Sequence, residues 1–273
     1  MLTLPIFTEP DVSHIKTGLR RKMLLRWLRL RERSSSLLRF RYNGFSYCLK
    51  AEAGAADHIL GSTFKIDNLI NAIPEAPKVV FDVGANCGLF SGMLLNSFPE
   101  AKVFAFEPNA DLQHAFLFNT NGRAFLEISG ISDCEEELTF YKTQGSQTST
   151  FVNGSDYLRD NKLVGEYKVR VTTLDAFCSK HSIDSIDVLK IDVQGLERKV
   201  LAGGGKILKT VSSLLIESSW SFPDTVFLVS DLINSYGFTN IYVLNNVFTG
   251  ADLLLRRSFS DKVKSPIAKY SSQ

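Results

Sequence analysis

An acidic residue followed by a glycine-rich turn is the first feature of the sequence that can do chemistry. The apolar residues 79–81 lead into Asp82, and Gly84, Asn86 and Gly88 follow at alternate positions. Glycines let the chain turn sharply and let a ligand approach the backbone closely. A dinucleotide-binding turn has a middle glycine that admits a pyrophosphate, and here that position is Asn86. Because the carboxylate of Asp82 would also repel phosphate, the turn favours a cationic ligand without phosphates, such as S-adenosylmethionine.

A second acidic residue, Glu107, ends the next apolar run, 25 positions after Asp82. A carboxylate at the end of a second strand can accept hydrogen bonds from both hydroxyls of a ribose. Glu107 therefore predicts a ribose-containing cofactor, although nicotinamide cofactors are held in the same way. Asp133, which follows the third predicted strand, is expected to accept a hydrogen bond from the adenine amino group.

A further group of charged residues occurs in and after the stretch VLKIDVQGLE, residues 188–197. Lys190 and Asp192 are two positions apart, so in a strand their side chains face the same way. A lysine in an otherwise apolar strand needs a partner, and we expect the two to pair at the mouth of the sheet. Glu217 ends the next strand, and Glu197 starts the intervening helix, where the helix dipole alone would also favour it. Asp192, Glu197 and Glu217 are predicted to ring one crevice.

If the ligand is S-adenosylmethionine, transfer of its methyl group requires that the acceptor atom is held in line with the methyl carbon and that a base takes a proton from the acceptor. Asp192 is the first candidate for this base and Glu217 the second. Clustered carboxylates repel one another unless a cation separates them. A Mg²⁺ or Mn²⁺ ion held by these two residues is therefore an alternative. We assign no catalytic role to the histidines, because none is near the strand-end acids in the sequence: His14, His58, His114 and His181.

Strands and helices alternate from residue 78 onward, and the predicted strands are almost continuously apolar. Strands are expected over 78–84, 102–108, 124–132, 186–193 and 212–219. The intervening helices are expected over 88–98, 110–121 and 195–208. This alternation predicts an α/β fold in which helices cover both faces of a parallel sheet. Such sheets bind ligands at the carboxyl ends of their strands, where the strand-end acids would meet.

The N-terminal part is strongly basic. Residues 1–50 hold 11 Lys and Arg against 3 Asp and Glu, whereas the rest of the chain has a net charge of −6. Residues 15–34 predict a basic amphipathic helix, with the apolar stripe Leu19, Met23, Trp27 and Leu30. We expect this stripe to dock on the chain's own domain, with arginines lining the approach to an acceptor. Alternatives are peripheral contact with an anionic membrane surface and a polyanionic substrate. Nucleic acid is not expected, because the charge is confined to one segment.

The same N-terminal part predicts a helix-plus-hairpin cap. Asn43-Gly44, flanked by alternating apolar and polar residues, indicates a hairpin, and 56–73 indicates a helix that ends before Pro74. We therefore expect a cap over 1–75, a main domain over 76–260 and a tail over 261–273. The polar segment 142–157 is expected to lie over the active-site mouth, where its hydroxyl and amide groups suit a polyhydroxylated acceptor.

Composition excludes several classes of protein. The 273 residues are 44% hydrophobic and 22% charged, as in ordinary globular proteins. The four cysteines include no C-x-x-C pair, which argues against a zinc site or a disulfide framework. They indicate a reducing compartment, so a cytoplasmic location is expected. There is no apolar run near the ~20 residues of a membrane span, and the first residues do not resemble a secretory signal.

Five motifs, in this order, resemble the FkbM-type methyltransferases, a branch of the class I S-adenosylmethionine-dependent methyltransferases: FDVGANCGLFS, FAFEPN, VTTLDAFC, VLKIDVQGLERKVLAGG and LLIESS. The resemblance covers about residues 79–220. It implies a Rossmann-like, mostly parallel seven-stranded sheet whose last strand is antiparallel, with 238–245 and 250–258 as the final pair. It also implies a cofactor site formed by the first motif together with Glu107: Asp82, Gly84, Ala85, Asn86 and Gly88.

Members of this family usually methylate hydroxyls of sugars or small natural products. The resemblance therefore implies an S-adenosylmethionine-dependent O-methyltransferase with a small-molecule or glycan acceptor. Two alternatives stay open. One is a non-catalytic module that keeps the fold and binds a nucleotide-like ligand, and the other is a nicotinamide-dependent oxidoreductase, which the missing middle glycine disfavours.

Overall fold

The computed structural model describes residues 9–15, 18–32, 36–52, 54–219, 232–247 and 250–257. The predicted tail over 261–273 lies outside these residues. Among the described helices, none combines the length and the apolar character that a membrane span requires.

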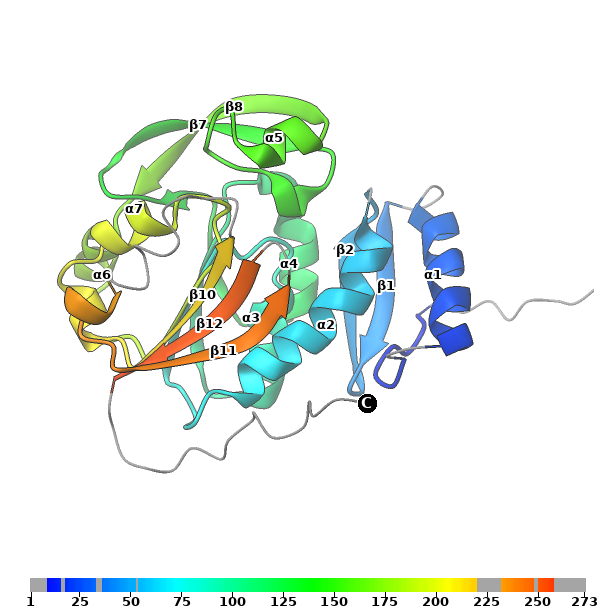
Figure 1. Cartoon of the computed structure of the whole chain (residues 1–273), viewed down its shortest axis with the longest axis horizontal. Helices are drawn as coiled ribbons and strands as arrows, with labels where there is room; N and C mark the ends of the chain where they lie inside the picture. Colours follow the sequence, from blue (N-terminus) through cyan, green and yellow to red (C-terminus); the bar gives the residue numbers. More distant parts are fainter. Residues whose placement is uncertain are drawn as a thin grey trace, which may run out of the picture.

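A seven-stranded sheet forms the centre of the molecule (Figure 1). Its order is β11-β12-β10-β9-β3-β4-β5. The neighbours from β10 to β5 pair in parallel, whereas β12 runs antiparallel to both β10 and β11. The predicted α/β, Rossmann-like sheet with an antiparallel last strand is therefore confirmed. The strands are β3 (Val79–Val83), β4 (Lys102–Phe106), β5 (Phe125–Glu127), β9 (Val188–Ile191), β10 (Ser213–Ser219), β11 (Asn240–Val247) and β12 (Gly250–Arg256).

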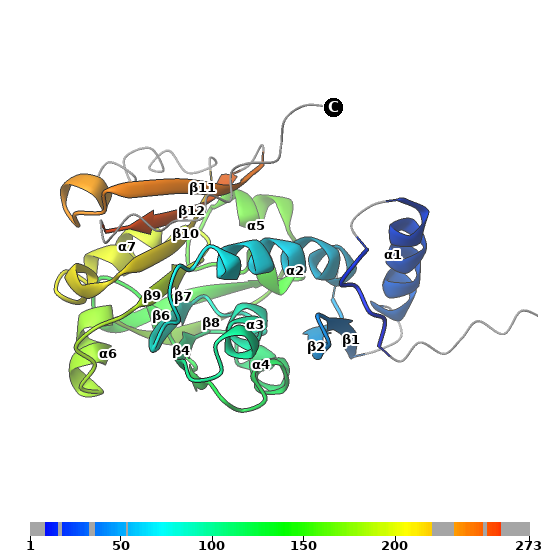
Figure 2. The same ribbon diagram turned by 90° about the horizontal axis from the view of Figure 1, so that it is seen from below.

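Helices cover both faces of this sheet, as Figure 2 shows. On one face Val80 and Val188 pack under α2 (Ala55–Asn71) and α3 (Leu89–Ser97), and α4 (Gln113–Thr120) lies beside α3. On the other face Phe81 and Leu189 pack against α6 (Leu174–Lys180) and α7 (Glu197–Ala202). Because side chains alternate along a strand, Asp82 faces the same side as Val80. That side carries α3, and Ser91 of α3 contacts Asp82.

A two-stranded hairpin and the basic helix precede the main sheet. β1 (Leu37–Tyr42) pairs with β2 (Phe45–Lys50), and the turn residues Asn43 and Gly44 have φ of 49° and 83°. Positive φ at both positions is what a two-residue type I′ turn requires, so the predicted hairpin is confirmed. One apolar core runs from this hairpin through α2 to the main sheet. The predicted boundary between residues 75 and 76 falls between α2 and β3, and it stays a prediction.

The basic helix α1 (Gly18–Glu32) packs through a different stripe from the predicted one. Leu28 is fully buried, and Leu24 and Leu25 are partly buried against the core. Met23 and Leu30 are 63% and 60% exposed. The predicted stripe is therefore wrong for these two residues. The helix carries two apolar faces, and the broader leucine face meets β1 and α2. Trp27 is partly buried at the edge of the core, and the side chain of Leu19 is not described.

A small three-stranded sheet lies across the carboxyl ends of the main strands (Figure 1). It comprises β6 (Gly130–Ile131), β7 (Glu136–Thr143) and β8 (Leu163–Thr172). The strand expected over 124–132 is divided, because β5 belongs to the main sheet and β6 pairs with β8. The short helices η2 (Ser146–Thr148) and α5 (Asp156–Asp160) connect β7 to β8. This arrangement brings the polar segment over the ends of the main strands.

Candidate active site

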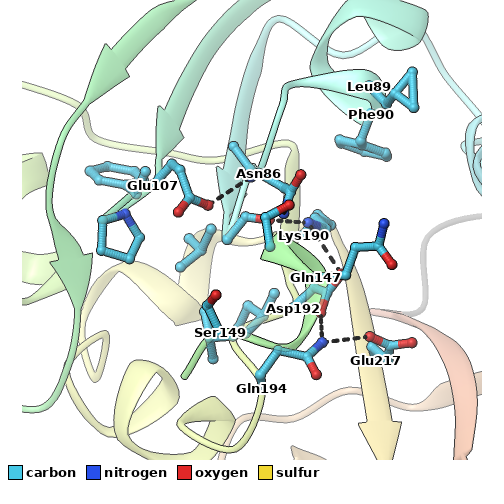
Figure 3. A pocket seen from close by; sticks show the side chains of 18 of the residues that line it. Asn86, Leu89, Phe90, Glu107, Gln147, Ser149, Lys190, Asp192, Gln194 and Glu217 are labelled. Atoms are coloured by element: carbon cyan, nitrogen blue, oxygen red, sulfur yellow. Dashed lines mark hydrogen bonds and ion pairs between the residues drawn. The ribbon is translucent and has the colours of Figure 1, made fainter. Parts of the chain in front are cut away.

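A cavity of about 400 Å³ opens at the carboxyl ends of β3, β4, β9 and β10. The turn after β3 forms one wall, β9 with the residues after it and the adjacent part of β10 form another, and α2 and the β7–β8 connection complete it. Figure 3 shows Glu107 on one side and Asp192, Gln194 and Glu217 on the other, with Lys190 between them. Among the strand-end acids that the sequence predicts to meet, Glu107, Asp192 and Glu217 line this cavity. The others do not, as described below.

The glycine-rich turn contributes Gly84, Ala85 and Asn86 to the wall of the cavity. Gly84 has φ of +78°, and a Cβ on it would lie 1.8 Å from the carbonyl oxygen of Asp192. Glycine is therefore required here because the backbone of the turn lies close to the backbone at Asp192. Gly88 does not line the cavity. Its φ is +76°, and a Cβ there would lie 2.5 Å from the ring of Phe116.

Asp82 is fully buried beneath the cavity and does not line it. Its Oδ2 accepts a hydrogen bond from Ser91 Oγ at 2.6 Å, and its Oδ1 lies 3.1 Å from Lys190 Nζ. Lys190 also donates to the carbonyl oxygen of Gly84 at 2.7 Å. Burial opposes the charged form of Lys190, but Asp82 and Asp192 outweigh it and raise the pKa of this lysine. Asp82 and charged Lys190 thus tie the glycine-rich turn to β9.

Glu107 is buried at the end of β4 and lines the cavity. Its two carboxyl oxygens each accept a backbone N–H at 2.8 Å, one from Asn86 and one from Asn109. Figure 3 shows the bond to Asn86. Burial raises the pKa of Glu107 to about 7, although these two hydrogen bonds oppose the shift. Each carboxylate oxygen has a second lone pair. The group can therefore accept further hydrogen bonds from hydroxyls in the cavity.

Asp192 and Glu217 are joined by one amide group. Gln194 Nε2 donates to Asp192 Oδ1 at 2.7 Å and to Glu217 Oε2 at 3.3 Å. The charge of Asp192, together with burial, raises the pKa of Glu217 to about 8. Burial opposes ionisation of Asp192 as well, but Lys190, 3.6 Å away, helps to lower the pKa of Asp192 to about 2. The pair therefore holds one proton at neutral pH and can take up or release it.

Lys65 of α2 supplies a positive charge that the sequence patterns did not indicate. Its Nζ lies 2.7 Å from Glu217 Oε1 and 2.9 Å from Oδ1 of Asp252, a residue of β12 that also lines the cavity. Burial lowers the pKa of Lys65, but the two carboxylates outweigh it and raise the pKa overall. Together with Lys190, this ammonium group separates the clustered carboxylates. The two ammonium groups therefore relieve the charge repulsion that motivated a Mg²⁺ or Mn²⁺ ion. The predicted ligands Asp192 and Glu217 are already bridged by the amide of Gln194, so this pair does not fit a metal while these side chains stay in place.

One face of α2 forms a wall of the cavity. His58, Ser62 and Lys65 recur at helical spacing, followed by Ile66 and Leu69 on the same face, and all five line the cavity. His58 therefore lies in the same cavity as the acids although it is far from them in the sequence, and the absence of a catalytic role for the histidines stays a prediction. Its Nδ1 is 2.9 Å from Ser62 Oγ. Burial lowers the pKa of His58 to about 4, against the opposing charge of Asp192, so the ring is neutral at physiological pH. The sequence signal that could have indicated this wall is the recurrence of His58, Ser62 and Lys65 three or four positions apart in a predicted helix.

The polar segment lies at the mouth of the cavity, as predicted. Its residues in the wall are Ser146, Gln147, Ser149 and Phe151. Ser146 Oγ accepts a hydrogen bond from Asn86 Nδ2 at 3.2 Å, and its backbone N–H donates to Glu52 Oε1 at 2.6 Å. These contacts link the segment to the glycine-rich turn and to the N-terminal part.

Glu197 and Asp133 do not line the cavity. The carboxylate of Glu197 accepts the backbone N–H groups of Gly195 and Val193 at 3.1–3.3 Å, next to the start of α7. Asp133 accepts from Ser132 Oγ at 3.0 Å and lies 3.6 Å from Lys199 Nζ. The structure thus brings neither residue to the cavity, and their predicted roles stay predictions. None of the described residues of α1 lines the cavity either, so the expected arginine-lined approach is not seen in the described part of the chain.

Comparison with known proteins gives a match to the family described as "Methyltransferase FkbM domain" over residues 82–239. Among curated proteins, the chain is 29% identical over 171 residues to 2-O-methyltransferase NoeI of Sinorhizobium fredii, covering 58% of this chain and 70% of that protein. It is 25% identical over 146 residues to hexuronic acid methyltransferase AglP of Haloferax volcanii, covering 52% and 56%.

A third match is to AMB antimetabolite synthetase AmbE of Pseudomonas aeruginosa, 30% identical over 205 residues. This alignment covers 60% of the chain but only 10% of that much longer protein.

Proposed function

Because the chain belongs to the FkbM methyltransferase family, we propose that it transfers a methyl group from S-adenosylmethionine to a hydroxyl of a sugar, a glycan or a small natural product. One observation carries the proposal. A single cavity contains Glu107 beside the glycine-rich turn on one side and the proton-sharing pair Asp192 and Glu217 on the other. These are the two functions that O-methyl transfer requires of a protein, a cofactor site and a base near it.

The side of the cavity near β3 and β4 would hold the cofactor. S-adenosylmethionine supplies a methyl group that its sulfonium charge already activates. Glu107 fits its ribose, because a carboxylate can accept both hydroxyls. The excess of carboxylates over lysines in the cavity fits the positive charge of the cofactor. In this proposal Gly84, Ala85 and Asn86 bind it directly, while Asp82 and Gly88 support the turn from beneath.

The other side would position the acceptor and take its proton. Asp192 remains our first candidate for the base and Glu217 the second. Lys190, held in its charged form, fixes the orientation of Asp192. A base works best when its pKa is near the working pH, and the sharing of one proton gives the pair a group that titrates near pH 8. His58 and Ser62 present neutral polar groups beside the pair.

Support for a sugar acceptor comes from the relatives and from the lining of the cavity. Two relatives are named for methylation of a 2-hydroxyl and of a hexuronic acid. In this chain the hydroxyl and amide side chains of Ser62, Gln147, Ser149 and Gln194 line the cavity. Such groups both donate and accept hydrogen bonds, as recognition of several hydroxyls requires. A cytoplasmic location, based on four free cysteines, is part of the same proposal.

A methylation screen tests this function. The purified chain is incubated with deuterium-methyl S-adenosylmethionine and a panel of neutral sugars, uronic acids and oligosaccharides, and products are analysed by mass spectrometry. We expect one labelled methyl group on an oxygen of a sugar, and about 100-fold less product or lower still with Asp192→Asn. Binding of S-adenosylmethionine without transfer to any member of a broad panel would favour the non-catalytic binding module. Methylation of a nitrogen or carbon atom would contradict the proposed acceptor.

A further inference from the structure

The helix α1 has two large apolar side chains that stay mostly exposed, in addition to the leucine face that packs on the protein. Leu24, Leu25 and Leu28 turn toward the core. Met23 and Leu30 remain 63% and 60% exposed. They are seven residues apart, which is close to two helical turns, so they project on the same side of the helix. Side chains of this kind are costly to leave in water.

Positive charge lies along one side of this outer face. Arg26 lies three residues after Met23 and four before Leu30, and is therefore on the same side of the helix. Lys22 directly precedes Met23, and Arg29 directly precedes Leu30, so both lie beside Arg26 on the helix surface. Lys22, Arg26 and Arg29 are all exposed. A surface groove at this position is lined by Lys22, Leu25, Arg26, Arg29 and Leu30.

Negative charge is scarce on the helix. Its only acidic residue, Glu32, accepts the backbone N–H of Ala56 at 2.5 Å and is thus occupied with α2. Asp57 of α2 pairs with Arg29 at 3.0 Å, but both side chains are more than half exposed, which makes such a pair weak. The outer face of α1 therefore presents an apolar stripe with arginine and lysine along one side.

We propose that the outer face of α1, defined by Lys22, Met23, Arg26, Arg29 and Leu30, binds the surface of a membrane rich in anionic phospholipid. An interfacial helix needs apolar side chains that enter the acyl boundary and cations that meet the headgroups, and this face combines both. A nucleic acid would match the cations but not the apolar stripe.

The position of α1 is compatible with such binding. Figures 1 and 2 both show α1 at one end of the molecule, separated from the main sheet by the hairpin and α2. No described residue of α1 lines the cavity. The helix can therefore meet a membrane while the cavity stays open, and the proposal does not depend on the identity of the reaction.

Vesicle co-sedimentation of the full chain tests the proposal. The probes are vesicles of phosphatidylcholine alone and of phosphatidylcholine mixed with phosphatidylglycerol, over a series of salt concentrations. We expect binding to the anionic vesicles at low salt, release at high salt because exposed charges are screened, and no binding to neutral vesicles. Met23→Ser with Leu30→Ser should reduce binding to the anionic vesicles by about tenfold or more, and Arg26→Glu should reduce it further.

The matched control is Leu163→Ser with Val164→Ser, which removes two exposed apolar side chains of β8, 45% and 52% exposed, far from α1 in sequence. It should bind as the unaltered chain does, and thermal melting should show that both double variants are folded. Failure of the unaltered chain to bind anionic vesicles overturns the proposal. So does retained binding by the Met23/Leu30 variant, which would indicate charge attraction alone. A dimer that this variant dissociates would show a second copy on the face, and would also overturn it.

Discussion

Lys65 Nζ lies 2.7 Å from Glu217 Oε1, so a residue of the helix that precedes the main sheet pairs with the carboxyl group near the end of β10. The same ammonium group lies 2.9 Å from Asp252. The ammonium group thus bridges two acidic side chains of the cavity. This contact ties α2 to the chemistry of the cavity and leads to the first prediction.

Replacement of Lys65 by methionine should create a weak metal site. Without the ammonium group, Glu217 and Asp252 lose the positive charge that they share, and the pKa of Glu217 should rise further. We expect a lower melting temperature for Lys65→Met, partly restored by Mg²⁺ or Mn²⁺, and no effect of either ion on the unaltered chain. Lys65→Arg, which keeps the charge, is the control. Loss of activity of the unaltered chain on dialysis against a chelator, with recovery on adding Mg²⁺, would show that a metal is used after all.

The pair Asp192 and Glu217 predicts a rising pH–rate profile. The doubly ionised pair is the better base, and its last proton leaves near pH 8. Turnover of the acceptor found in the methylation screen should therefore increase as the pH rises through about 8. Glu217→Gln should remove this titration. Asp192→Asn should lower turnover by about 100-fold or more while leaving cofactor binding intact. Normal turnover in Asp192→Asn would end its assignment as the base.

Glu107 predicts that cofactor affinity depends on pH. Ribose hydroxyls donate to its ionised form, and burial raises its pKa to about 7 in the unliganded protein. Binding must then drive off a proton at low pH, so the affinity for S-adenosylhomocysteine should increase from pH 6 to pH 8. Glu107→Gln should weaken binding by about 1.5–3 kcal/mol and flatten the pH dependence. An unchanged affinity in a folded Glu107→Gln variant would remove Glu107 from the site.

Gly84 predicts a stability defect that a neighbouring control can calibrate. Alanine at this position meets both an unfavourable positive φ and the carbonyl oxygen of Asp192 at 1.8 Å. We expect Gly84→Ala to lower the free energy of unfolding by about 2–5 kcal/mol. Gly122 has φ of +66° with no atom within 4 Å of an added Cβ, so Gly122→Ala should cost only about 1–2 kcal/mol. Equal effects in chemical denaturation would show that the β3 turn can move away from β9.

Local patterns were sufficient for much of the fold. Asn43-Gly44 specifies its hairpin turn through two neighbouring residues, and apolar runs of strand length mark β3, β4, β9 and β10. The meeting of Asp192 and Glu217 also follows, because parallel neighbours bring their carboxyl ends to one edge. These features depend on residues that are close in the chain or on a rule common to all parallel sheets.

Other features depend on which faces meet, and no local pattern specifies that. Lys65 and Glu217 are 152 positions apart, and only the packing of α2 brings them together. The apolar residues of α1 allow two packing faces, and the choice of Leu28 over Met23 depends on the shape of the surface beneath. The burial of Asp82 could likewise not be predicted, because the sequence does not distinguish a strand-end acid that binds a ligand from one that pairs with a lysine.

The most direct test of the central claim is calorimetric titration of the full chain with S-adenosylhomocysteine, S-adenosylmethionine and NAD. The account predicts saturable binding of both S-adenosyl compounds at one site per chain, competition between them, weaker binding in the Glu107→Gln variant and no binding of NAD. Binding of NAD in place of S-adenosylhomocysteine, or no binding of either S-adenosyl compound by the folded chain, would contradict it.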